Sequence, residues 1–151
     1  ISNLLLKVRV TMAGKSNAVV FVVAYAPTEA TEDMHVKSMF RKTLHETVDR
    51  VPTREQLFVL MDANARKGKR DSVGERGNVT TIGAHGRDVQ NDSGHRLLGF
   101  AGDNELAALS TFYSTQNGHE SQTHKGPKGE KWRLDYALTR QTDRRLVRIV
   151  R

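Results

Sequence analysis

Two acidic side chains and one amide lie at or near the ends of apolar segments, where they could hold a cation or activate water. Asp62 and Asn64 directly follow the apolar run 57–61. In an extended segment, residues two apart point the same way, so both side chains can reach one point beyond the strand. A carboxylate beside a carboxamide suits a hard cation or the orientation of an attacking water. The same pair also fits an ordinary Asx turn after a strand.

A third acidic residue, Asp135, lies between Leu134 and Tyr136 in a second apolar segment. Burying a carboxylate there is costly without a positive or hydrogen-bonding partner, so a histidine or a metal is expected beside it. The alternative is an edge strand on which Asp135 faces water. Tyr25 ends another apolar segment and could project its hydroxyl into the region of Asp62, although a tyrosine at a strand end is more often half-buried in a core.

Other common sites are excluded by composition. The 151-residue chain has no cysteine, which removes disulfides, thiolate zinc sites and cysteine nucleophiles. It has no Walker loop, dinucleotide fingerprint or nucleophile elbow. No apolar run approaches the length that crosses a bilayer, and no secretory leader opens the chain. We therefore expect an intracellular protein, plausibly nuclear, with no membrane partner and no small-molecule cofactor; its oligomeric state is left open.

Positive charge is concentrated late in the sequence. The formal net charge is +7 and the pI is about 10.0. Residues 125–151 hold nine Lys/Arg and three Asp/Glu, a net charge of +6, whereas residues 1–62 hold eight and seven, a net charge of +1. Such a distribution favours an anionic partner such as nucleic acid, although a solvated basic surface fits the composition equally well.

The elements that must position these residues are strands covered by an amphipathic helix. Segments 4–12 and 18–25 are apolar and β-branched with turn residues between them, which predicts a β-hairpin. The second segment is continuously apolar and should be a central strand. Thr31 can cap a helix whose apolar positions recur as far as Val51, before Pro52 ends it.

Further along the chain, a long Gly-rich charged loop over roughly 65–90 exceeds the usual connection of about a dozen residues, which marks it as functional or mobile. Asn91 or Asp92 can cap a helix that runs to about Asn104. Short strands are expected at 106–113, 120–124, 132–139 and 145–150. Since the long helix needs a sheet to cover, we expect one α/β or α+β domain, 1–151, with stacked sheets.

Taken in order, these segments resemble one superfamily. Val-Ala-Tyr25-Ala-Pro27, Leu-Met-Asp62-Ala-Asn64 and Trp132-Arg-Leu-Asp135-Tyr resemble three successive motifs of the endonuclease/exonuclease/phosphatase superfamily. That superfamily includes abasic-site endonucleases and the endonuclease domains of non-LTR retrotransposons. The stretch 85–112 resembles its retrotransposon and craniofacial development protein 2-like branch. The resemblance spans nearly the whole chain.

The resemblance implies a four-layered α/β sandwich, in which two mixed sheets face each other under outer helices and the active site lies where strand ends meet. It implies that Asp62 positions or deprotonates the water that attacks phosphorus. Asn64 would orient that water or help Asp62 to hold Mg²⁺, with Mn²⁺ as the alternative ion. Tyr25 would contact the scissile phosphate. Asp135 would pair with a catalytic histidine, which in this family comes from a Ser-Asp-His segment near the C-terminus.

The resemblance also suggests substrate-binding residues. Trp132 and Leu134 align with residues that line the sugar pocket of abasic-site enzymes, and Asn91, Asn104 and Arg133 are further candidates for substrate contact. Phosphodiester hydrolysis places extra negative charge on nonbridging oxygens, which a divalent cation and fixed donors stabilise. The late basic segment would neutralise the phosphates of DNA on either side of the cut.

Departures from the family pattern bear on activity. Met61 and Ala63 stand where relatives usually have the glycine and phenylalanine of Gly-Asp-Phe-Asn, and Thr123-His124 stands where relatives often have Thr-Trp. The family's early Asn and metal-binding Glu are expected upstream of these residues, and its Ser-Asp-His downstream. We therefore expect a domain truncated at both ends, with weak or no catalysis on its own.

Three functions remain open from the sequence. The first is a Mg²⁺-dependent DNA endonuclease of the retrotransposon type. The second is a noncatalytic descendant that keeps the fold and binds nucleic acid or protein. The third is a phosphomonoesterase or phosphoinositide-type phosphatase of the same superfamily, against which stands the net charge of +6 in residues 125–151, because such a charge suits a polyanion better than a small phosphate ester.

Overall fold

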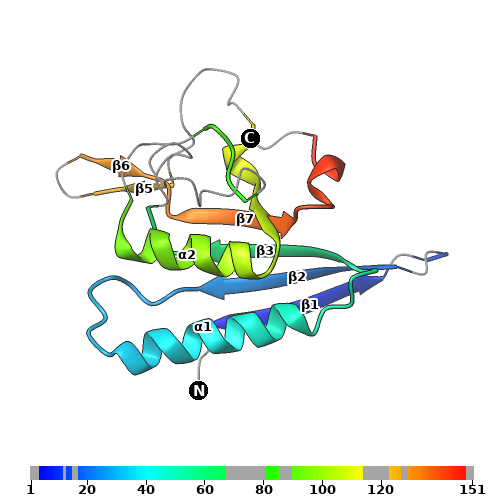
Figure 1. The fold of residues 1–151 in the computed structure, drawn as a ribbon, viewed down its shortest axis with the longest axis horizontal. Helices are drawn as coiled ribbons and strands as arrows, with labels where there is room; N and C mark the ends of the chain where they lie inside the picture. The colour runs from blue at the N-terminus through cyan, green and yellow to red at the C-terminus, as the bar shows by residue number, and fades with distance from the viewer. Residues whose placement is uncertain are drawn as a thin grey trace.

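A five-stranded mixed sheet forms the centre of the computed structural model (Figure 1). The structure describes residues 4–11, 13–14, 17–66, 81–85, 90–113, 123–126 and 129–148. The strands of the sheet lie in the order β1 (Leu5–Thr11), β2 (Ala18–Tyr25), β3 (Gln56–Asp62), β7 (Asp135–Arg140) and β4 (Leu106–Ala108). A separate two-stranded sheet consists of β5 (His124–Lys125) and β6 (Lys131–Trp132). β2 and β3 are parallel, and the other neighbours are antiparallel.

The first two strands form the predicted hairpin. β1 pairs with β2 from Leu5↔Ala24 to Thr11↔Ala18. β2 then lies between β1 and β3, so the prediction of a central strand from its continuous apolar run is confirmed. Because β2 and β3 are parallel, both end at the same edge of the sheet, and Tyr25 and Asp62 are their last residues.

Two α-helices pack on the sheet, and one begins later than predicted. α1 (Met34–Asp49) is capped by Asp33, whose carboxylate accepts the backbone N–H groups of His35 at 2.8 Å and Val36 at 3.4 Å. The prediction that Thr31 caps it is wrong, because the carboxylate two residues further on reaches the free amides of the first turn. α2 (Asp92–Asp103) is capped by Asn91, as predicted.

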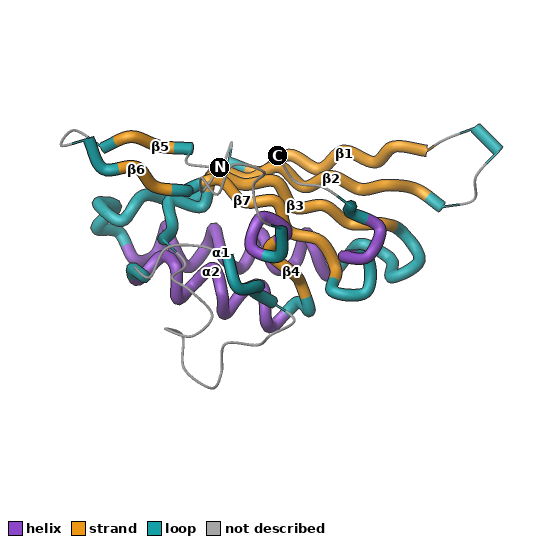
Figure 2. The backbone as a smooth tube through the Cα atoms, turned by 90° about the horizontal axis from the view of Figure 1, so that it is seen from above, coloured by secondary structure: helices purple, strands orange, loops and turns teal. Residues whose placement is uncertain are grey.

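Both α-helices lie on the same side of the sheet, as Figure 2 shows from above. We call the side beneath them the covered face; its buried side chains include Val20, Val22, Leu57, Val59, Tyr136 and Leu138. We call the other side the open face; it carries Leu6, Val8, Val10, Phe21, Val23, Tyr25, Phe58, Leu60, Asp62, Asp135 and Ala137. Six of these side chains remain 38–59% exposed, namely Leu6, Val8, Val10, Val23, Tyr25 and Leu60. Neither α-helix of the described residues covers them.

The predicted mixed α/β class is confirmed, with corrections to its short strands. The strand expected over 106–113 ends at Ala108 and continues as a 3₁₀ turn, η2 (Leu109–Thr111), in which the Thr111 hydroxyl donates to the Ala108 carbonyl at 2.7 Å. The strand expected over 132–139 is divided into β6 and β7. The strand expected over 145–150 begins instead with a 3₁₀ turn, η3 (Arg144–Leu146); residues 149–151 and most of the predicted loop 65–90 lie outside the described residues.

A buried carboxylate on the helix side of the sheet is fully paired. Glu55, 4% exposed, accepts two hydrogen bonds from Arg9, from Nη2 at 2.7 Å and Nε at 3.1 Å. These hydrogen bonds from Arg9 hold the pKa of Glu55 below its ordinary value. The charge of Glu55 is therefore compensated within the chain. None of the helices in the described part of the chain has the length and apolar character to span a membrane.

Candidate active site

Three predicted site residues lie in one row across the open face, where β2 and β3 end and β7 begins. Tyr25 is in register with Asp62, and Asp62 is in register with Asp135. Residues opposite each other on neighbouring strands point to the same face, with Cβ atoms about 5 Å apart in an antiparallel pair. Tyr25 is 49% exposed, so its hydroxyl reaches solvent beside the carboxylates. The predicted meeting of Tyr25 with Asp62 is thus confirmed by the sheet register.

Asp135 is exposed, which corrects the expectation of a buried carboxylate. It does not lie on an edge strand either, because β7 is flanked by β3 and β4. Its exposure follows from its place on the open face, because the next residue, Tyr136 on the covered face, is only 4% exposed. The backbone N–H of Asp135 donates to the hydroxyl of Thr123 at 3.2 Å. Within the described residues no histidine or other donor contacts the Asp135 carboxylate, so the expected partner is not among them.

Asp62 and Asn64 form an Asx turn and do not point to one spot. The Asp62 carboxylate accepts the backbone N–H of Asn64 at 3.0 Å through Oδ1. Asn64 has a φ of 46°, and its side-chain amide donates to the carbonyl of Ala26 at 2.8 Å. The expectation of parallel side chains assumed extended backbone, which ends one residue earlier. Asn64 therefore ties the end of β3 to the end of β2, while Oδ2 of Asp62 stays open.

The row borders a broad cavity that we call the strand-end basin, with a volume of about 660 Å³. Its polar lining comprises Tyr25, Asp62, Ser110, Thr123, Arg133 and Asp135. Ser110 contributes a buried hydroxyl with no hydrogen-bond partner among the described residues. Thr123 accepts the N–H groups of Leu134 and Asp135 and so fixes the backbone that carries the second carboxylate. Sequence reasoning missed both residues; Thr123 was marked only by its place in a family motif, and Ser110 by nothing.

Of the three candidates at 132–134, Arg133 alone lines the basin. Its guanidinium donates to the Ser110 carbonyl at 3.2 Å, which holds the cation at the basin wall. Trp132 lies beneath the guanidinium of Arg66, whose Cζ is 4.8 Å from the ring centroid. The carbonyl of Leu134 accepts the N–H of Ala63 at 2.8 Å. Trp132 and Leu134 therefore support the segment around Asp62 from outside the basin.

The two candidate asparagines act within the scaffold. The side-chain oxygen of Asn91 accepts the N–H groups of Gly94 at 2.9 Å and Arg66 at 2.8 Å, which joins the start of α2 to the segment after β3. A Cβ at Gly94 would lie 2.0 Å from the Arg66 carbonyl oxygen, so a side chain there would force the backbone apart. Asn104 caps the far end of α2 and donates to the Phe100 carbonyl at 2.8 Å. The structure does not bring Asn104 to the row, because the chain that follows it pairs with the opposite end of β7.

A small hairpin brings two cations to the same end of the sheet. Lys125 of β5 pairs directly with Lys131 of β6, and both side chains are exposed. Figures 1 and 2 both show this hairpin at the end where β2 and β3 finish. Like charges opposite each other on two strands repel. An anion at this position would relieve that repulsion.

The two carboxylates, Asp62 and Asp135, would be stabilised by a cation rather than by an anion. Among the described residues, no group of three or more His, Asp or Glu side chains forms a metal cluster. Asp62 and Asp135 nevertheless place two carboxylates side by side, which is unfavourable without a cation between them. Mg²⁺ typically takes one or two carboxylates, several waters and substrate phosphates. The pair fits that donor set. The side-chain nitrogen of Asn64 is bound to the Ala26 carbonyl, so only its side-chain oxygen could serve as a further ligand.

The sheet and its helices have the same fold as a solved endonuclease domain. The chain superposes on the solved endonuclease domain of TRAS1, a telomere-specific non-LTR retrotransposon, with a TM-score of 0.64. The superposition covers 99% of this chain and 56% of that one, at 18% sequence identity. At this identity the match establishes the shared fold.

Two curated proteins are similar to the chain in sequence. Craniofacial development protein 2 of Bos taurus is 28% identical over 135 residues, and that of Tragulus javanicus is 28% identical over 129 residues. These matches cover 89% and 85% of the chain, which spans about a fifth of the length of either relative. No family model matches the chain. The sequence relatives and the structural match together support the relationship to the endonuclease/exonuclease/phosphatase superfamily that the motifs predicted.

Proposed function

We propose that the strand-end basin is the cation-binding part of a phosphodiesterase site that cleaves DNA in a Mg²⁺-dependent reaction. The observation that carries the proposal is the row Tyr25–Asp62–Asp135, in which two carboxylates lie opposite each other beside a free hydroxyl. A cation of the Mg²⁺ type, or Mn²⁺, relieves the repulsion of the two carboxylates. When bound, it supplies a Lewis acid for the phosphate oxygens and lowers the pKa of bound water.

The chain's own residues supply orientation and charge. One oxygen of Asp62 is fixed by the Asn64 N–H, so the other is held in a defined direction to accept a proton from the attacking water. The Tyr25 hydroxyl donates to a nonbridging oxygen of the scissile phosphate. Arg133, held at the basin wall by Ser110, neutralises charge that develops on phosphorus-bound oxygens.

DNA is the proposed substrate because the cations beside the basin suit a repeating backbone of phosphates. Lys125 and Lys131 are side by side on the hairpin next to the row, in the part of the sequence with a net charge of +6. Each phosphate that they neutralise releases a counterion, which makes binding dependent on salt. A nuclear location would follow from this substrate.

Metal binding tests the proposal directly. We expect Mn²⁺ to broaden the NMR signals of Tyr25, Asp62 and Asp135 selectively in the 151-residue chain, and Mg²⁺ to compete. Asp62→Asn and Asp135→Asn should each weaken that binding. If the broadening is unchanged in both variants, the acidic pair is not the metal site and the proposal is wrong.

Nicking of supercoiled plasmid is the second measurement. We expect little relaxed circle from these 151 residues with Mg²⁺, because only two acidic ligands lie together in the described part of the chain. Strong nicking that disappears in Asp62→Ala would show that the 151 residues suffice for catalysis. Strong nicking that survives Asp62→Ala would assign catalysis to other residues.

The second candidate function is noncatalytic binding of nucleic acid on the same fold. It is favoured by the absence of a basic partner for the Asp135 carboxylate among the described residues. Duplex DNA binding distinguishes the two candidates. A noncatalytic binder would hold duplex DNA equally well with and without Mg²⁺ and would be unaffected by Asp62→Asn.

A further inference from the structure

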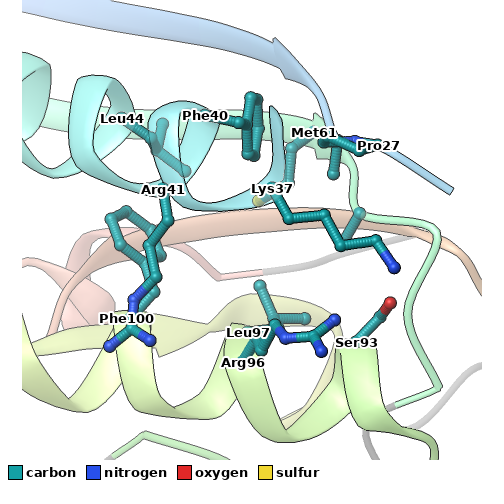
Figure 3. Close-up of a pocket in the computed structure, with 12 residues that line it drawn as sticks. Pro27, Lys37, Phe40, Arg41, Leu44, Met61, Ser93, Arg96, Leu97 and Phe100 are labelled. Atoms are coloured by element: carbon teal, nitrogen blue, oxygen red, sulfur yellow. The ribbon is translucent and has the colours of Figure 1, made fainter. Parts of the chain in front are cut away.

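A second cavity lies between α1 and α2, on the covered side of the sheet (Figure 3). We call it the interhelical groove. Its floor is formed by apolar side chains from both helices and from β3, namely Phe40, Leu44, Met61, Leu97 and Phe100. The groove is separate from the strand-end basin, which opens on the other face of the sheet.

The rim of this groove is positively charged. Lys37 and Arg41 come from α1, Arg96 comes from α2, and no acidic residue lines the groove. Arg41 pairs with Asp103 at 3.5 Å, and Arg96 pairs with Asp92. Figure 3 shows Lys37, Arg96 and the hydroxyl of Ser93 directed toward one end of the groove. That end is therefore polar and cationic above an apolar floor.

Lys37 differs from the two arginines in its partner. Its ammonium donates to the backbone carbonyl of Glu29 at 3.1 Å, and it forms no ion pair with a carboxylate of the described residues. A carbonyl satisfies one donor of an ammonium that has three. Lys37 thus retains its charge and two donors for a ligand at the rim.

The size of the groove limits what can occupy it. Its interior volume is about 70 Å³, and a single water needs roughly 10–15 Å³ measured in this way. Such a space takes one or two apolar side chains. Pockets that enclose a drug-sized molecule or a cofactor are several times larger, about 300–1,000 Å³.

We propose that the interhelical groove binds an acidic amphipathic helix of a partner protein. One or two apolar anchors of that helix, spaced at i and i+4, would enter the groove and contact Phe40 and Leu97. Carboxylates on either side of the anchors would meet Lys37 and Arg96. This is the usual way in which a helix lies in an apolar groove, with apolar contacts for affinity and charges at the rim for orientation.

Duplex DNA suits the groove less well than a peptide. A phosphate backbone would satisfy the cations, but it has nothing to place on the apolar floor. The proposal is independent of the proposed nuclease function, because the groove shares neither face nor cations with the row of Tyr25, Asp62 and Asp135.

The test uses a fluorescein-labelled three-turn helical peptide with Leu at i, i+4 and i+8 and Glu at the flanking positions, titrated with the 151-residue chain. Binding should shift the NMR amide signals of α1 and α2 and leave those of Leu60 and Asp62 in place. The same peptide with Leu replaced by Ser should not bind. A peptide with Glu replaced by Lys should bind at least about tenfold more weakly, a difference of about 1.4 kcal/mol.

Matched substitutions on α1 complete the test. Lys37→Glu should weaken binding of the acidic peptide about tenfold, whereas Lys42→Glu, an exposed lysine of the same helix outside the groove, should change it less than about twofold. Equal effects of the two substitutions, or no binding of the acidic peptide, would overturn the proposal. Duplex DNA that shifts the same α1 and α2 signals and displaces the peptide would also overturn it, in favour of a nucleic acid ligand.

Discussion

The two faces of the central sheet differ in the burial of their apolar side chains and in the pairing of their carboxylates. On the covered face, Leu57 is fully buried, and the nearby Glu55 is paired with Arg9. On the open face, apolar Leu60 is 38% exposed, and the carboxylates of Asp62 and Asp135 lie together without a cation among the described residues. The buried Leu57 and Glu55 are thus satisfied within the chain. The apolar side chains and the two carboxylates of the open face would be satisfied by a ligand or another surface.

This difference suggests how stability and chemistry are divided along a single strand. β3 alternates between the two faces, so Leu57 and Val59 are part of the core while Asp62 is part of the row. A change at one position need not affect the function of the next. Substitutions on the covered face should therefore reduce folding, and those at the end of the open face should reduce binding.

The largest expected effect is on the free energy of unfolding. Leu57→Ala, on the covered face, should lower it by about 2–5 kcal/mol, because a fully buried leucine leaves a cavity. Leu60→Ala, three residues along the same strand but on the open face, should lower it by less than about 1 kcal/mol. Urea denaturation followed by circular dichroism measures both. Equal losses would mean that the open face is covered in solution.

Much of this contrast was readable from the sequence. The continuous apolar run of β2 predicted a central strand, and the position of Tyr25 and Asp62 at the ends of two apolar segments predicted that the two side chains meet. The exposure of Asp135 was not predictable, because it depends on which face of the sheet the helices leave uncovered. The Asx turn of Asp62 and Asn64, one of the two readings of that pair, is confirmed, whereas the positive φ of Asn64 is not visible in a pattern of alternation.

The distribution of charge in the sequence does not show which cations are available to a ligand. The nine cations of residues 125–151 are equivalent in the sequence. In the structure, Arg140 donates to the backbone carbonyls of Val51 and Glu55, so it closes the turn between α1 and β3, whereas Lys125 and Lys131 are exposed. Long-range contacts of this kind join residues about ninety positions apart, and no local pattern encodes them.

The next effect concerns metal binding at the end of the open face. Asp62→Asn should weaken Mg²⁺ binding by about tenfold or more, equivalent to about 1.4 kcal/mol, because one of two opposed carboxylates loses its charge. The free energy of unfolding should stay the same or rise slightly as the repulsion is removed. Asp49→Asn, at the exposed end of α1, is the matched control and should leave Mg²⁺ affinity unchanged. Competition with Mn²⁺ monitored by NMR gives the affinities.

A smaller effect is expected from the lysine pair of the hairpin. In Lys125→Ala/Lys131→Ala, the slope of log K for duplex DNA against log salt should become shallower by about 2, since each phosphate contact contributes about 0.9. Lys42→Ala, on the helix side, should leave the slope unchanged. Fluorescence anisotropy at several salt concentrations measures this. A slope equal to that of the unmodified chain would place the DNA elsewhere.

The smallest expected effect lies on the helix side, in the dependence of stability on pH. Because hydrogen bonds from Arg9 lower the pKa of Glu55 in the folded chain, their contribution is fully present above the ordinary glutamate pKa of 4.5. It is lost as the pH falls from there through the lowered pKa of the folded state. In Glu55→Gln, the melting temperature should therefore depend less on pH in this acidic range. Glu46→Gln, whose carboxylate lies in a longer 3.5 Å pair with Arg50 on the surface of α1, should leave the profile almost unchanged. If the two variants give the same profile, the ion pair of Glu55 with Arg9 does not contribute to the stability of the folded chain.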